Sequence, residues 1–322
     1  MSYNRSGIAV AGIASGIALG TVFGVYVLGP HSGASSQITR HNVDTERKVD
    51  SVTAERNQAN KNVQAADQLG ISLAPEAVSG RLQDKGVLII TTPDTNKDDV
   101  NAVKALIEPS GGHLAGTIGL KDAFIKRGGG DDLKSIAATT LPAGVQLSEH
   151  NSSPGRHIGQ LMGGTFLKKT RSGDLTSKEQ STGTERKIVS DALTQGDFIT
   201  AEGLDQSADV AILVTGDSDG KDGNRDYVAG LIHDFAYGLK DNGTGVVVAS
   251  RSGAAQRDGV VDRLRKSSSK GSRGDSGKAV STVDDIDHFT GQVSAVRAAA
   301  DEIAGKQGSY GTMDGAKATI AE

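Results

Sequence analysis

The chain begins with a long uncharged segment, and its hydrophobic positions become periodic only further along. No charged side chain lies between Gly7 and Gly29, a stretch of about 23 residues or roughly 34 Å of helix, which is enough to span a bilayer. Arg5 is the only charged side chain before it, and the positive-inside rule then places residues 1–6 in the cytoplasm. We therefore expect a transmembrane anchor over 7–29. A cleaved signal peptide, whose apolar core is usually shorter, is the alternative.

Glycine recurs at every fourth position of this segment. The four residues are Gly12, Gly16, Gly20 and Gly24. In water each would cost a helix about 1 kcal/mol relative to alanine, whereas in lipid small residues four apart let two helix backbones approach closely. We expect these glycines to form a packing seam for another helix, either a second copy of the anchor or a partner's. A Gly/Ala-rich span without a partner is the alternative interpretation.

A polar segment without internal proline, residues 31–69, follows the anchor. Its apolar residues recur at alternating three- and four-residue steps when Arg56 fills one position: Val49, Val52, Ala59, Val63 and Ala66. This spacing is typical of a coiled-coil seam. We expect a helical stalk that ends at Gly70 and Pro75, either as a dimeric coiled coil or as a solitary solvated helix.

From about residue 84 the pattern changes to alternating strands and helices. Continuous apolar runs predict strands at 86–93, 113–120, 209–217, 245–250 and 279–283. Apolar faces predict helices at 224–240 and 290–305, and another that Asn96 caps and Pro109 ends. Strands that alternate with helices form mostly parallel sheets covered on both faces, so we expect a Rossmann-like α/β domain over 84–322. A division into two α/β lobes near residue 200 is the alternative.

Two polar segments interrupt this pattern. Residues 168–187 start as a loop and then gain helical character, and residues 263–278 form a Ser/Gly-rich stretch. The second segment has six basic side chains against Asp275 alone. A mobile, solvated loop is the first interpretation, and contact with an anionic surface, such as a lipid headgroup or an acidic wall polymer, is the second.

Composition narrows the class of protein. The chain has 322 residues, 36% hydrophobic and 23% charged, which is typical of a folded protein of one or two domains. A net charge of −4 gives no general attraction to nucleic acid, so we expect no nucleic-acid partner. The absence of cysteine excludes disulfides, thiolate metal sites and cysteine nucleophiles.

Patterns that carry catalytic or cofactor chemistry are missing from the sequence. It contains neither a dinucleotide-binding nor a P-loop glycine motif, and no nucleophile elbow or H-E-x-x-H. Asp217, Asp219 and Asp222 share one turn but lack the order of an EF-hand. The histidines and methionines are scattered, although His150, His157 and Met162 are close enough in sequence to converge. We expect no enzyme and no cofactor, and the residues of any metal site stay unknown.

One acidic cluster follows the last predicted strand. Asp284, Asp285 and Asp287 lie in "STVDDID", residues 281–287, just before the last predicted helix. Carboxylates at that position stabilise a helix N-terminus, and this is our first interpretation. Binding of a cation or of a partner's arginine is the second.

Four short segments stand in an order that resembles a known family. They are "TTPDTNKDDVNAV" (91–103), "LPAGVQLS" (141–148), "STVDDID" (281–287) and "YGT" (310–312). Together with the apolar N-terminal span and charged stalk, they resemble the actinobacterial copper transport protein B (MctB) family over nearly the whole chain. The resemblance implies an envelope protein of copper transport or homeostasis, with copper as the implied metal, and it identifies no copper ligand at any position.

Two functions are therefore expected for a single-pass protein of the cell membrane whose bulk is extracytoplasmic, in the cell envelope. The first, implied by the resemblance, is a part in copper transport. The second is a non-enzymatic docking or scaffold protein that pairs with a membrane, division or cell-wall-remodelling partner. The partner is another membrane or envelope protein, or a second copy bound through anchor and stalk.

Overall fold

A computed structural model describes residues 35–170, 177–217, 224–269 and 279–322. The predicted cytoplasmic end, the anchor over 7–29 and its glycine seam lie outside these residues. In the part of the chain that is described, no helix combines the length and the apolar character needed to cross a membrane. The chain divides into two compact units, Met1–Gln68 and Leu69–Glu322.

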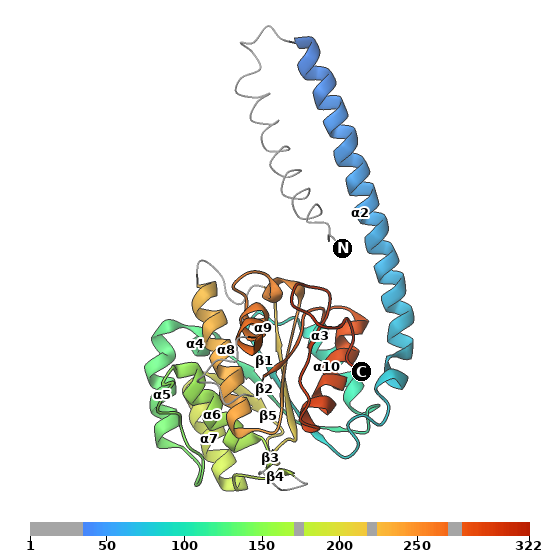
Figure 1. Ribbon diagram of the computed structural model, residues 1–322. Coiled ribbons are helices and arrows are strands. Elements are labelled where there is room, and N and C mark those ends of the chain that lie inside the picture. Colours follow the sequence, from blue (N-terminus) through green and yellow to red (C-terminus); the bar gives the residue numbers. More distant parts are fainter. Residues whose placement is uncertain (1–34, 171–176, 218–223, 270–278) are drawn as a thin grey trace. The chain divides into compact units, whose positions relative to one another are not determined.

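The predicted stalk is helical, but the helix extends beyond its expected end. Helix α2 (Ser35–Val78) continues through Gly70 and Pro75, so the prediction that these residues end it was wrong (Figure 1). Gly70 is a packing residue instead, because a Cβ there would collide with the Phe289 ring. Pro75 lies in the last turn, where its missing N–H removes a single helical hydrogen bond. The core of the second unit includes Ala74, Val78 and Leu82 and so begins before residue 84.

Seven strands form one sheet with the order β5-β2-β1-β6-β7-β8-β9. Their bounds are β1 Gly86–Thr91, β2 His113–Leu120, β5 Ile199–Glu202, β6 Val210–Thr215, β7 Val246–Ser250, β8 Ser281–Val283 and β9 Ser309–Tyr310. Every neighbouring pair is parallel except β2 and β5. Taken in chain order the strands lie 3-2-1-4-5-6-7, which is the Rossmann order with an antiparallel third strand and an added seventh. Strands from both sides of residue 200 share this sheet, so the alternative division into two lobes is not found.

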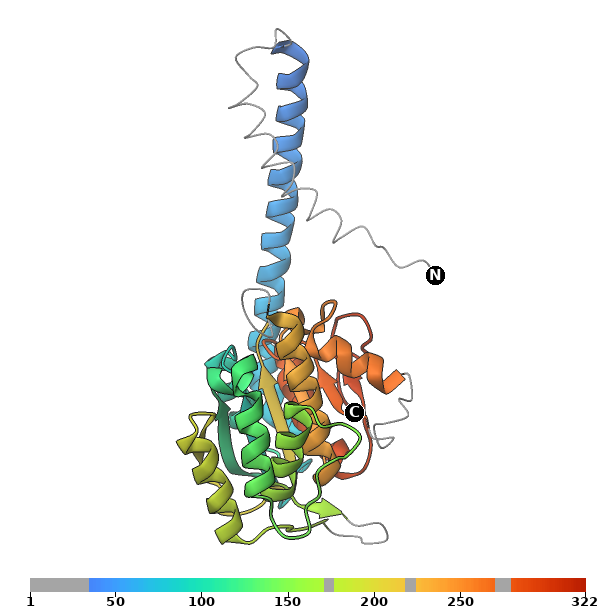
Figure 2. The same ribbon diagram turned by 90° about the vertical axis from the view of Figure 1, so that its left-hand side faces the viewer.

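Helices cover both faces of the sheet (Figures 1 and 2). One face carries α3 (Lys97–Ile107) and α10 (Phe289–Ile303). The other carries α6 (Pro154–Phe166), α8 (Arg225–Asn242) and α9 (Val260–Ser269), together with α4 (Asp122–Ile125), α5 (Gly130–Thr139) and α7 (Gly183–Gln195). Short connections complete the chain: the 3₁₀ turns η3 (Arg127–Gly129) and η4 (Ser252–Ala255), and the antiparallel pair β3 (Lys169–Thr170) and β4 (Ser177–Lys178).

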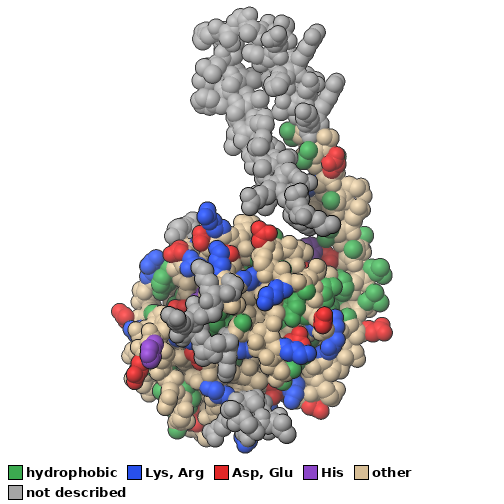
Figure 3. All heavy atoms as spheres, viewed as in Figure 1, with side chains coloured by type: hydrophobic (Ala, Val, Ile, Leu, Met, Phe, Trp, Pro, Cys, Tyr) green, Lys and Arg blue, Asp and Glu red, His purple; other side chains and the backbone are tan. Residues whose placement is uncertain are grey.

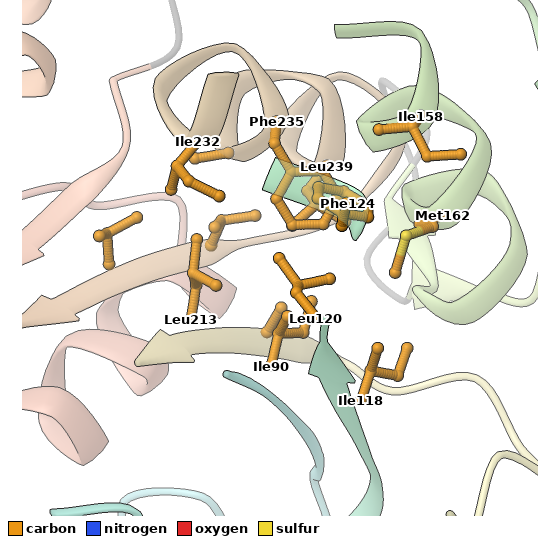
Figure 4. Close-up of a cluster of buried hydrophobic side chains, with 14 of the residues drawn as sticks. Ile90, Ile118, Leu120, Phe124, Ile158, Met162, Leu213, Ile232, Phe235 and Leu239 are labelled. Carbon is orange, nitrogen blue, oxygen red and sulfur yellow. The ribbon is translucent and has the colours of Figure 1, made fainter. Parts of the chain in front are cut away.

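The central strands are buried on both sides, and this explains their continuous apolar sequences. In β1, Leu88 and Ile90 belong to the hydrophobic cluster under α6 and α8, while Val87 and Ile89 belong to the cluster under α3 and α10. Figure 4 shows the first cluster, in which strand residues meet side chains of α4, α6 and α8. Its rings include Phe124 and Phe235, whose centroids lie 5.3 Å apart in an edge-to-face arrangement.

Glycines allow the two helices α6 and α8 to touch backbone to backbone. A Cβ at Gly159 of α6 would lie 2.9 Å from Cα of Gly238 in α8, and one at Gly163 would lie 2.6 Å from the carbonyl oxygen of Leu239. Gly155 makes the same kind of contact with Leu231. Residues 154–166 show no predicted element in the sequence, and their four glycines lower helix propensity. Tertiary packing stabilises the helix instead.

Replacement of Gly159 tests this contact. Gly159→Ala forces the new methyl group against the α8 backbone, so we expect a loss of about 3 kcal/mol in the free energy of unfolding. Gly128→Ala is the matched control because nothing lies within 4 Å of its Cβ position. Urea unfolding of the full chain in detergent, followed by circular dichroism, gives both values. Equal midpoints for the two variants would contradict a close α6–α8 contact.

Candidate functional site

Ligands of Rossmann-like sheets bind beyond the carboxyl ends of the strands where the strand order reverses, here between β1 and β6. This crevice is occupied by the chain's own polar groups. The Thr92 hydroxyl donates to Asp94 Oδ1 at 2.6 Å and lies 3.0 Å from Thr215 Oγ1. The carboxylate of Asp94 lies against Gly216, where a Cβ would be 2.7 Å from Asp94 Oδ2.

The first turn of α3 carries negative charge next to this crevice. The Asn96 side chain caps the helix, as the sequence predicts, and accepts from the Asp98 N–H at 2.9 Å. Asp99, in the same turn, forms a bidentate pair with Arg251, with N–O distances of 2.8 and 3.1 Å. The Asp99 carboxylate raises the pKa of Arg251. Carboxylates thus occupy the helix terminus that holds phosphate in dinucleotide-binding proteins, so the geometry disfavours a nucleotide.

The three residues of the predicted acidic cluster lie in one loop but have different surroundings. Asp284 is fully buried and forms an ion pair with Arg265 at 2.7 Å. Its Oδ1 also accepts from the Thr312 N–H at 2.8 Å, and Arg265 donates to the Tyr310 carbonyl oxygen at 2.9 Å. Asp284 and Arg265 therefore hold the segment that follows β9 against the end of β8.

Asp285 precedes α10 and is 2% exposed; the N-cap of α10 is His288 without a side-chain cap hydrogen bond, so no carboxylate of the cluster caps this helix as we expected. Its Oδ2 accepts from the Thr290 hydroxyl at 2.7 Å, while Oδ1 is buried without a hydrogen-bond partner among the described residues. Burial, reinforced by the neighbouring Asp284, raises the pKa of Asp285 to about 6. Asp287 is exposed, and its Oδ2 lies 3.9 Å from His288 Nε2.

The described residues bring no metal-ligating group together. Among them, no cluster of three or more His, Asp or Glu side chains is arranged to hold a metal ion. Asp217 accepts from the Gly253 N–H at 3.1 Å, and Asp219 and Asp222 lie outside the described residues. His157 Nε2 is 3.0 Å from the Ser148 carbonyl oxygen, and Met162 is buried in the core.

One chain of polar contacts is not foreseen from the sequence. Ser267 Oγ of α9 lies 2.9 Å from His233 Nε2, and His233 Nδ1 lies 3.0 Å from Asp234 Oδ1, both on α8. Asp234 Oδ2 accepts in turn from Ser153, the N-cap of α6, at 2.6 Å. A serine–histidine–aspartate order is that of an activated nucleophile. Ser267, however, lies inside a helix, whose backbone N–H groups serve the helix rather than an oxyanion, so these contacts link three helices.

Exposed aliphatic side chains gather on α2. Among the described residues, five of the seven large hydrophobic side chains that are exposed belong to this helix: Val52, Val63, Leu69, Ile71 and Leu73. Hydrophobic side chains are visible along this helix in Figure 3. The predicted seam contains the first two of these residues and stops at Ala66. A signal for its continuation is present in the sequence, because Leu73 follows Ala66 by seven residues.

The raised pKa of Asp285 predicts a pH-dependent stability. The folded chain binds this proton more tightly than the unfolded chain. The stability that protonation of Asp285 contributes to the fold is therefore present at low pH and is lost as pH rises through about 6. Relative to Asp285→Asn, the wild-type free energy of unfolding should fall by about 2 kcal/mol from about pH 4.5 to about pH 7.5. Asp131→Asn, at an exposed site, should keep the wild-type slope. Parallel curves for wild type and Asp285→Asn in urea titrations would contradict this assignment.

Comparison with known proteins identifies the family. The family described as "Copper transport outer membrane protein, MctB" matches residues 2–321. The "Copper transporter MctB" of Mycobacterium tuberculosis (strain ATCC 25618 / H37Rv) is 29% identical over 325 residues, which cover 98% of each chain. The protein of the same name from Mycobacterium leprae (strain TN) is 29% identical over 239 residues, or 71% of each chain. The chain therefore belongs to the MctB family of copper transport outer membrane proteins.

Proposed function

We propose that the protein serves copper transport in the cell envelope by docking a partner protein, and that it is not an enzyme. Its relatives in Mycobacterium carry the name copper transporter, and copper is therefore the proposed cargo of the system in which it works. The observation that carries the docking role is the concentration of exposed aliphatic side chains on α2. Large apolar groups that stay exposed together on one element mark an interaction surface.

The proposed topology is a single-pass tether with residues 1–6 in the cytoplasm and the α/β body outside the membrane. The uncharged stretch over 7–29 is long enough for this role, and its four-residue glycine spacing suits helix association in lipid. Helix α2 has 44 residues, or roughly 66 Å at 1.5 Å per residue. A tether followed by a helix of this length presents a long surface to a neighbouring protein.

The contacts at the sheet edge favour a non-enzymatic role. Asp284 is neutralised by Arg265, and Asp99 by Arg251, so neither carboxylate is left to act as an acid or a base. The crevice between β1 and β6 holds Asp94 and Thr92 in mutual contact. The proposal does not require the chain itself to bind copper. Cu(I) prefers thiolate and thioether ligands, and the chain has no cysteine to supply a thiolate.

A second candidate keeps the docking role and changes the partner. In it, α2 holds a protein of cell-wall remodelling or division, and copper tolerance is affected indirectly through the envelope. The exposed face of α2 favours both candidates equally. The phenotype of cells with a substituted α2 face, in copper tolerance and in cell separation, distinguishes them.

Substitution of the α2 face distinguishes these candidates in cells that lack the chromosomal copy. We expect Val52→Lys with Val63→Lys to lower the copper concentration that cells tolerate by about twofold or more, because docking would then bury unpaired charges. Ala54→Lys with Gln64→Lys, at exposed positions away from this face, should behave as wild type. Loss of cell separation with normal copper tolerance would support the second candidate. Normal behaviour in both assays, with normal protein levels, would contradict docking through α2.

Copper titration tests whether the protein carries the metal itself. We expect the purified full chain in detergent to bind Cu(I) no more tightly than about 1 μM, because a strong soft-metal site needs several convergent Cys, Met or His ligands. Competition with a Cu(I) chelator of known affinity gives the constant. Tighter binding at one equivalent would contradict a purely docking role and would place copper on this chain.

A further inference from the structure

A row of apolar residues with a seven-residue repeat runs along the exposed part of α2. It consists of Val52, Ala59, Ala66 and Leu73, and all four are exposed, Val52 by 42% and Leu73 by 51%. The row is about 32 Å long at 1.5 Å rise per residue. A strict seven-residue repeat is the pattern by which one helix keeps the same face toward another helix over several turns.

A second row lies beside the first at three- and four-residue offsets. Its members are Val49, Arg56, Val63 and Gly70. Val63 is 45% exposed, whereas Gly70 is covered by the Phe289 ring. Near Gly70, at the C-terminal end of the rows, Leu69 is 66% exposed and flanks the first row. The two rows thus have the spacing of the a and d positions of a coiled coil, and the d row continues to Leu73 after Phe289 has covered the a row.

We propose that the partner docked by this face is a second copy of this chain, with the two α2 helices paired in parallel and in register. A rod-like apolar strip of this length needs an equally long apolar strip opposite it, and another α2 supplies one. The proposal rests on the membrane tether of the proposed function, because anchors that start from the same membrane leave two stalks running in the same direction.

The charges beside the rows fit this arrangement. Arg56 occupies an a position and Glu55 the adjacent g position, and both are exposed. In a parallel, in-register pair, each Arg56 lies next to Glu55 of the second copy, so two opposite-charge contacts form across the seam. A polar residue at a single a position fixes the register of a coiled coil at a cost in stability. Ala59 and Ala66 also bury little surface, so the pair depends on the raised local concentration that anchoring in one membrane provides.

Disulfide trapping tests the pairing directly, because the natural chain has no cysteine. The full-length variants Ala59→Cys and Ala66→Cys place one thiol in the d row, where equivalent residues of two parallel helices face each other. Ala54→Cys places it on the opposite side of the helix and is the matched control. Each variant is reconstituted in phosphatidylcholine vesicles and treated with diamide. We expect both d-row variants to form covalent dimers at least about tenfold faster than Ala54→Cys.

A further substitution separates pairing from folding. Val63→Lys in the Ala66→Cys background should reduce trapping at least about tenfold, since two lysines then meet in the seam, while Gln64→Lys in the same background should leave it unchanged. Equal trapping rates at residues 54, 59 and 66, or no dimer at any of them with normal helix content, would overturn the proposal.

The copper tolerance of cells that carry the same variants distinguishes a failure of self-pairing from a failure of the proposed function. If Val63→Lys lowers tolerance but neither Ala59→Cys nor Ala66→Cys alone traps a dimer, a different protein covers α2: docking then stands and self-pairing fails. If the dimer is trapped and tolerance does not depend on the seam, self-pairing stands and the proposed function fails.

Discussion

The close approach of α6 and α8 is the constraint on which much of the body depends. Glycines at the contact leave no space between the two backbones, so α6 fixes how α8 lies over the sheet. Arg156 and Gln160 of α6 then reach Asp241 of α8 at 2.7 Å each. A buried ion pair of α8 Lys240 with α10 Glu302 joins the helix layers on the two faces. Burial raises the pKa of Glu302, so this link depends on its lysine partner remaining in place.

The same constraint extends to the acidic loop. Polar contacts run from Ser153 at the start of α6, through Asp234 and His233, to Ser267 of α9. Helix α9 also carries Arg265, which neutralises Asp284 and holds the residues after β9. An acidic cluster that looks like a binding site in the sequence is therefore one end of a packing arrangement that begins with glycines more than 100 residues earlier in the chain.

The sequence predicts best where one physical requirement decides the structure. Strands buried on both faces must be apolar throughout, and the runs at 86–93, 209–217 and 245–250 do become β1, β6 and β7. Local propensity fails where tertiary contacts decide. Helix α9 lies partly in the basic segment read as a loop, yet its Val260, Val261 and Leu264 are buried. The partner of Asp284 comes from that same segment, so no pattern around the acidic residues could reveal it.

Glycine spacing illustrates what a sequence pattern can and cannot specify. Gly155, Gly159 and Gly163 recur at every fourth position of α6, as four glycines do in the predicted anchor. In α6 the pattern is satisfied within the chain, because α8 packs against all three glycines. The spacing therefore specifies how closely a second helix backbone can approach, but it does not specify which chain supplies that helix. The face of α2 differs, because branched side chains remain exposed over many turns and exposed aliphatic area is unfavourable until something covers it. For this reason the information about partners lies in α2 rather than in any glycine row.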